Sequence, residues 1–152
     1  MVRAGENAFL IEDFQNKYIV VIGHNYLGNL TNVNSKEEIR GRLREYRPQF
    51  GERQIGIRVR KISYFLFDMN LHEWVITYNP KTREYLIGII KSKYEHNSDL
   101  CKYHNIRRVK WSHFVKRDNL SEPSQKHLSY RRAVFPIDKQ VADEIINLME
   151  LL

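Results

Sequence analysis

Runs of hydrophobic residues with two different spacings divide this chain into strands and helices. Apolar runs rich in β-branched and aromatic residues predict strands at residues 18–23, 74–78, 85–90, 106–111 and 133–137. Apolar residues three or four positions apart predict a helix around residues 10–14, one after Ser35, one over 59–69 and one after Asp138. This order predicts an α+β fold with a mixed sheet or small barrel and packed helices, not a repeated βαβ pattern.

Local signals fix several element boundaries. Ser35 stands three residues before Glu38, the spacing of a capping box, and Pro48 ends the helix that follows. The turn at residues 79–82 contains a proline and predicts a hairpin between its two flanking strands. Arg58, Arg60 and Lys61 fall near the expected start of the third helix, where cations oppose the helix dipole, so we expect them to serve another role.

The length of 152 residues predicts a single domain over residues 1–152. Cys101 is the only cysteine, so no intramolecular disulfide can form. The sequence has no signal-peptide pattern and no apolar run of about 18 residues, the length expected of a membrane-spanning helix. We therefore expect a cytoplasmic protein with no membrane partner.

Positive charge is concentrated in one part of the sequence. The net charge of the chain is +7, and residues 101–132 contain nine Lys or Arg against two Asp or Glu, a local excess of +7. Such segregation suits a phosphate backbone. Residues 121–132 are expected to form an exposed polar loop that also suits phosphates. The candidate backbone contacts are Arg58, Arg60, Lys61, Arg107, Arg108, Lys126, Arg131 and Arg132.

No catalytic motif is apparent. The six histidines form no compact pair on a helix and no cluster with Cys-x-x-Cys spacing. The sequence also has no GxSxG nucleophile motif, no GxxxxGK phosphate loop and no dinucleotide fingerprint. We therefore expect a binding module with no catalytic residues, no metal and no cofactor.

Two polar loops combine aromatic and amide side chains directly after predicted strands. His24, Asn25 and Tyr26 follow the first strand, while Tyr94 and His96 follow the third. Aromatic faces stack on a flat, uncharged methylated base, and amides hydrogen-bond its edge. These loops therefore predict a base pocket, although Tyr26 and Tyr94 are equally suited to covering the edges of the core.

The ordered segments of the chain resemble the EVE and YTH branch of the PUA-like superfamily, in particular modules at the N-terminus of modification-dependent restriction proteins. The segments that carry the resemblance are Met1–Gly5, Ile19–His24, Ile62–Tyr78, Tyr85–Tyr94, Ile106–Trp111, Arg117–Ser121 and Ala133–Phe135. The resemblance implies a curved mixed β-barrel flanked by helices, with an aromatic pocket for a flipped modified base. It also implies a nuclease or NTPase, either as a separate partner or in a longer restriction protein that has this module at its N-terminus.

Carried over by position, the resemblance assigns the base pocket residue by residue. His24 occupies the position of a wall that is commonly tryptophan in such modules, Tyr94 or His96 occupies a second wall, and Asn7 lies in the turn that contacts the base edge. The predicted function is recognition of a methylated base in DNA, by base flipping, to target a restriction nuclease. An RNA-binding PUA-like domain and a small metal-dependent nuclease are the alternatives.

Overall fold

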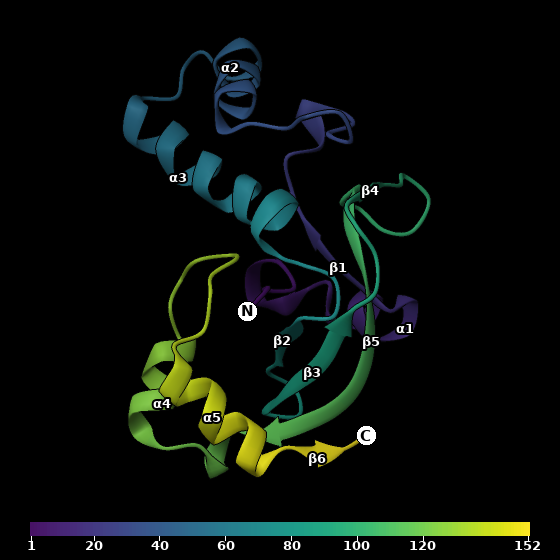
Figure 1. Cartoon of the computed structure of the whole chain (residues 1–152), viewed down its shortest axis with the longest axis vertical. Helices are drawn as coiled ribbons and strands as arrows, with labels where there is room; N and C mark the ends of the chain where they lie inside the picture. The colour runs from purple at the N-terminus through teal and green to yellow at the C-terminus, as the bar shows by residue number, and fades with distance from the viewer.

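The computed structural model describes all 152 residues and has an α+β fold (Figure 1). The helices are α1 (Ile11–Lys17), α2 (Lys36–Tyr46), α3 (Glu52–Ser63), α4 (Glu122–Leu128) and α5 (Lys139–Leu148). The strands are β1 (Ile19–Ile22), β2 (Trp74–Asn79), β3 (Glu84–Ile90), β4 (Glu95–His96), β5 (Asn105–Lys116) and β6 (Glu150–Leu151). Short 3-10 turns cover Glu6–Ala8, Asn25–Leu27 and Arg117–Asn119, and a π-turn at Tyr64–Asp68 extends α3.

The sheet is built around β5, the long curved strand in Figure 1. The strand order is β1-β5-β3-β2, and both β4 and β6 also pair with β5. Every strand pairing is antiparallel. The predicted curved mixed barrel is therefore corrected to an antiparallel sheet curled into a half-barrel.

Two extended segments continue the curl of the sheet beyond β2. The Val2 amide donates a hydrogen bond to the Ile76 carbonyl at 2.9 Å, and the Arg3 amide donates to the Ala133 carbonyl at 2.8 Å. The opposite end of the sheet is β1, which pairs only with β5. A gap thus remains between β1 and the segments at residues 1–4 and 133–135.

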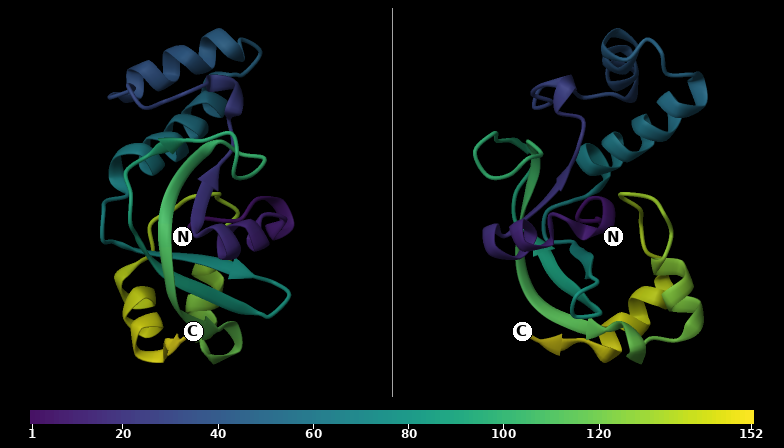
Figure 2. Two further views of the ribbon diagram at one scale, coloured as in Figure 1. Left: turned by 90° about the vertical axis from the view of Figure 1, so that its right-hand side faces the viewer. Right: turned by 180° about the vertical axis from the view of Figure 1, so that it is seen from behind.

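Four of the five helices lie at the two ends of the molecule, with the sheet between them, and α1 lies beside the sheet near β1. The α2–α3 pair projects from one end, and α4 and α5 cover the other (Figures 1 and 2). One apolar cluster joins β1 to α1, α2 and α3, and a second joins β3 and β5 to α4 and α5. The loop between α4 and α5 extends beside the N-terminal segment toward α3 (Figure 2). This loop therefore lies next to the gap in the half-barrel.

Several local predictions are confirmed. The Ser35 hydroxyl accepts a hydrogen bond from the Glu38 amide at 3.2 Å, so it caps α2 as the capping-box spacing indicated. The β2–β3 hairpin is antiparallel, as predicted. Helices also form after residue 10 and after Asp138, each with a buried apolar face.

Two predictions in the C-terminal third are wrong. Residues 133–137 form no strand, because only Val134 makes a bridge, with Val2. The segment expected to be a loop contains α4, and the hydroxyls of Ser121 and Ser124 both hydrogen-bond the Glu144 carboxylate. These hydroxyls therefore hold α4 against α5 and are already used within the protein.

The third helix starts earlier than its apolar spacing indicated. It begins at Glu52, so Arg60 and Lys61 lie in its last turn. Cations favour the helix dipole at that end, so the argument that they oppose it is wrong. The apolar face of the helix includes Ile55, which is buried four residues before Val59, so the pattern extends one turn further toward the N-terminus than predicted.

Gly88 packs directly against β5, with no room for a side chain. The strand register shifts at this residue, and a Cβ added to it would lie 2.7 Å from the Lys110 carbonyl oxygen and 2.8 Å from the Trp111 ring. This Cβ would also lie 2.6 Å from the Val109 side chain, and all three distances are shorter than van der Waals contact with residues of β5. Only glycine fits this position.

We predict that Gly88→Ala lowers the free energy of unfolding by about 1 to 3 kcal/mol, the usual cost of overpacking a core. Gly56→Ala on α3 is the matched control, since nothing lies within 4 Å of the added Cβ. It should raise stability by about 0.5 to 1 kcal/mol through helix propensity. Urea unfolding measures both values, and a Gly88→Ala variant as stable as the wild type would contradict the account of this contact.

Candidate functional site

A pocket of about 440 Å³ occupies the gap where the half-barrel does not close. One side is formed by residues 21–24, which are the last two residues of β1 and the two that follow it. The facing side is formed by the N-terminal turn and by the loop before α5, and α3 contributes its last turn. The lining residues are Arg3, Gly5, Glu6, Val21, Ile22, Gly23, His24, Lys61, Tyr103, Arg131 and Ala133.

His24 presents a neutral imidazole to this pocket. Its Nδ1 atom lies 2.9 Å from the Tyr26 hydroxyl, whereas its Nε2 atom is buried and has no hydrogen-bond partner. Burial, followed by the nearby cations of Lys61, Arg58 and Arg47, lowers the pKa of His24 to about 3. The ring is therefore uncharged at neutral pH, and its buried Nε2 atom has no partner within the protein.

Tyr103 supplies an aromatic ring that the sequence prediction missed. Its ring atoms lie 3.6 to 3.8 Å from the position of a Cβ on Gly23. The Asn25 amide holds the Tyr103 loop in place by donating to the Lys102 carbonyl at 2.9 Å and accepting from the His104 amide at 3.0 Å. Ile22 pairs with Asn105, so continuing that antiparallel register places Tyr103 opposite His24; the register is the signal that identifies it.

A buried hydrogen-bond chain fixes the end of β1. Asn105 is completely buried, its amide donates to the Gly23 carbonyl at 2.7 Å, and its oxygen accepts from the Tyr94 hydroxyl at 2.6 Å. The Tyr94 hydroxyl also accepts from the Leu30 amide at 3.1 Å. Tyr94 therefore supports the pocket from behind and lines a different cavity, so it is not a second wall.

Cations dominate the polar lining of the pocket. Lys61 has no ion-pair partner, and burial together with Arg58 lowers its pKa to about 8, so most of it stays charged at neutral pH. Arg131 is exposed at the mouth of the pocket. Arg3 donates to the carbonyls of Leu128, Tyr130 and Arg132 and thus fixes the loop that carries Arg131. Glu6 is the only acidic lining residue.

Residues with positive φ angles lie on both sides of the pocket, in the N-terminal turn and directly after β1. Gly5, Asn7, Ala8 and His24 all have positive φ angles, of 76°, 53°, 55° and 70°. Non-glycine residues rarely adopt this region, and such strain gathers at ligand sites. Asn7 lines a neighbouring pocket of about 520 Å³ that shares Arg3, Gly5, Glu6 and Arg131 with the first.

Two further residues expected in the base pocket lie outside it. The Arg47 guanidinium covers one face of the Tyr26 ring, 3.7 Å from its centroid, and the Tyr26 hydroxyl contacts His24. Tyr26 is therefore a positioning residue for His24. His96 packs edge-on against His104 at 5.8 Å and is not among the residues that line the pocket.

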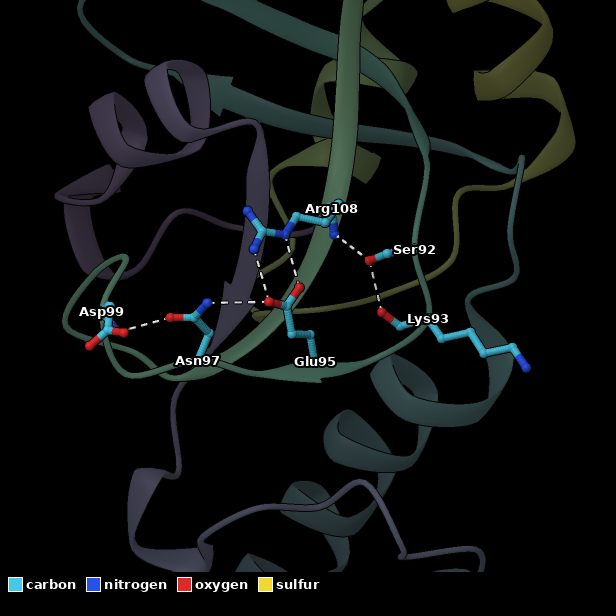
Figure 3. Close-up of polar contacts among 6 residues, drawn as sticks. All are labelled: Ser92, Lys93, Glu95, Asn97, Asp99 and Arg108. Atoms are coloured by element: carbon cyan, nitrogen blue, oxygen red, sulfur yellow. Dashed lines mark hydrogen bonds and ion pairs between the residues drawn. The ribbon is translucent and has the colours of Figure 1, made fainter.

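Two of the arginines expected to contact phosphates are occupied within the protein. Arg107 is only 2% exposed and donates to the carbonyls of Ser92 and Phe65, so its predicted contact with phosphate is corrected to a structural role. Arg108 makes a two-point ion pair with Glu95, with N–O distances of 2.8 and 2.9 Å (Figure 3). Its charge is thereby largely neutralised.

The remaining basic candidates differ in exposure. Arg60, Lys126, Arg131 and Arg132 are exposed and take part in no ion pair. The Arg58 guanidinium lies 4.0 Å from the centroid of the Phe50 ring and donates to the Gln54 carbonyl. No group of three or more His, Cys, Asp or Glu side chains is arranged to hold a metal ion. No helix has the length and apolar character needed to cross a membrane.

Comparisons with known proteins give one match. No curated protein and no solved structure matches the chain. One family model, described as "Domain of unknown function (DUF8426)", matches residues 2–138, nearly the whole length. The chain therefore belongs to the DUF8426 family.

Proposed function

We propose that this protein is a DNA-binding module that recognises a methylated base, extruded from the duplex into the pocket between β1 and the N-terminal turn. The module has no catalytic role of its own in this proposal. Its resemblance to restriction modules extends the proposal to a nuclease or NTPase partner, fused or separate, which would cut DNA once the base is bound.

The observation that carries the proposal is the combination of groups in one pocket. Tyr103 offers an aromatic ring, His24 offers an uncharged imidazole ring, and the volume of about 440 Å³ falls in the range of small-molecule sites. A base is flat, uncharged and rich in hydrogen-bonding atoms, so it suits such a lining. The cations Lys61 and Arg131 line the same pocket, and in this proposal they bind the phosphates of the nucleotide.

The energies are compatible with this mode of binding. Extruding a base costs a few kcal/mol, and stacking on an aromatic ring returns about 1 to 3 kcal/mol per base. Phosphate contacts offset the rest, because each one releases condensed counterions. The exposed cations Arg131 and Arg132 lie on the loop that borders the pocket, so backbone contact and base capture take place side by side.

We predict that Tyr103→Ala weakens binding to a duplex with one 5-methylcytosine or one N6-methyladenine by about 1 to 3 kcal/mol, the worth of one stacked base. Binding to plain duplex should change much less. Tyr46→Ala is the matched control, since Tyr46 is 48% exposed on α2 and lines none of the pockets described above. Fluorescence anisotropy measures each affinity, and thermal unfolding confirms that each variant is folded.

Three outcomes would count against the proposal. Equal affinity of the wild type for methylated and plain DNA removes methylated-base recognition. Stronger binding to the same methylated base in RNA replaces DNA with RNA as the ligand. Magnesium-dependent cutting by the pure chain, lost when an acidic residue is replaced, makes it a nuclease.

We predict that the Arg131→Ala, Arg132→Ala double variant flattens the salt dependence of DNA binding. Two lost phosphate contacts reduce the slope of log K against log salt by about 1.8 for B-DNA. The control removes Arg40 and Arg44, two charges that pair with Glu52 on α3, and should leave the slope nearly unchanged. A slope equal to that of the wild type in the Arg131/Arg132 variant would show that this loop does not contact the backbone.

A further inference from the structure

The free edge of β1 points into the pocket. The Val109 amide donates to the Tyr18 carbonyl, next to β1. The carbonyls of His104 and Arg108 accept from the amides of Asn97 and Lys91, on the other side of β5. In an antiparallel pair the residues alternate between facing the partner and facing away. Val20 and Ile22 therefore bond β5, and Val21 directs its N–H and C=O away from the sheet.

These two backbone groups of Val21 have no partner in the protein. β1 pairs with β5 alone, Val21 faces away from β5, and no hydrogen bond from a turn, loop or side chain reaches its backbone, although the residue is only 2% exposed. Buried backbone groups are almost always paired, because an unpaired one costs as much as a lost hydrogen bond. Val21 also lines the pocket, so a ligand there is placed to satisfy both groups.

The surroundings favour a small planar ligand over an added peptide strand. α1 ends directly before β1, and His24 turns the chain away with a φ angle of 70° directly after Gly23. The open edge is therefore limited to residues 21–23, too short for strand addition. A nucleobase has the matching size, with donor and acceptor atoms side by side on one edge.

We infer that the backbone of Val21 reads the hydrogen-bonding edge of the bound base, its N–H donating to a ring nitrogen and its C=O accepting from the exocyclic amine. This inference rests on the proposed function and specifies its ligand class, a methylated base that keeps an N–H on its amine beside an unprotonated ring nitrogen. 5-Methylcytosine and N6-methyladenine both meet this requirement. Lys61, which lines the same pocket, then binds the phosphate of the nucleotide.

A proline at position 21 tests the donor half of the contact. Proline removes the N–H and is tolerated on an edge strand where that N–H faces outward. Val21→Pro should bind the preferred methylated duplex about tenfold more weakly, in line with one lost hydrogen bond. Val21→Ala is the reference variant, because it loses side-chain packing but keeps the amide, so the difference in affinity between the two variants isolates the effect of the N–H.

Modified ligands test the acceptor half on the unaltered protein. Full methylation of the amine, as N4,N4-dimethyl-5-methylcytosine or N6,N6-dimethyladenine, removes the N–H and should reduce affinity to that of plain DNA. N4-methyl-5-methylcytosine keeps one N–H and controls for bulk in the cytosine series, and N6-methyladenine is the same control in the adenine series.

Undiminished binding of the dimethylated base overturns the inference and leaves the proposed function standing. The experiment with modified ligands uses the unaltered protein, so it gives this result even if Val21→Pro does not fold. Equal binding of singly methylated and plain DNA by the wild type removes the proposed function itself.

Discussion

The antiparallel pairing of β1 with β5 is the constraint on which the candidate site depends. The buried side chain of Asn105 locks it, with one end on the Gly23 carbonyl and the other on the Tyr94 hydroxyl. A buried amide with both ends bonded specifies one register, since any slip leaves polar groups unpaired in the core. That register leaves Val21 on an open edge and brings Tyr103 over Gly23.

The residues that line the pocket are held in position by neighbouring side chains that lie outside it. Asn25 fixes the loop that carries Tyr103, and Tyr26 fixes the His24 ring. Burial, and after it the nearby cations, lower the pKa of His24 and keep its ring uncharged in an otherwise positive site. A base is neutral and its phosphates are negative, so this division of charge suits a nucleotide as a whole.

Local features were predictable from the sequence, and features that depend on register were not. The cap at Ser35 and the β2–β3 hairpin follow from residues close together in the chain. The polar and aromatic character of the loops after β1 and β3 is evident from the sequence, but the role of Tyr26 and Tyr94 as supports is not, because it depends on the partners that their hydroxyls find in the fold. Burial of Arg107 on β5 likewise depends on contacts with Phe65, a residue distant in sequence.

Backbone amide shifts measured by NMR test most directly whether a base enters the gap beside β1. The spectrum of the labelled protein is compared with one plain duplex and with the same duplex carrying a single methylated base. The account predicts that only the methylated duplex shifts the amides of Val21, Gly23 and Tyr103, while both duplexes shift Arg131 and Arg132. Identical shifts with the two duplexes, confined to the loop before α5, would contradict it.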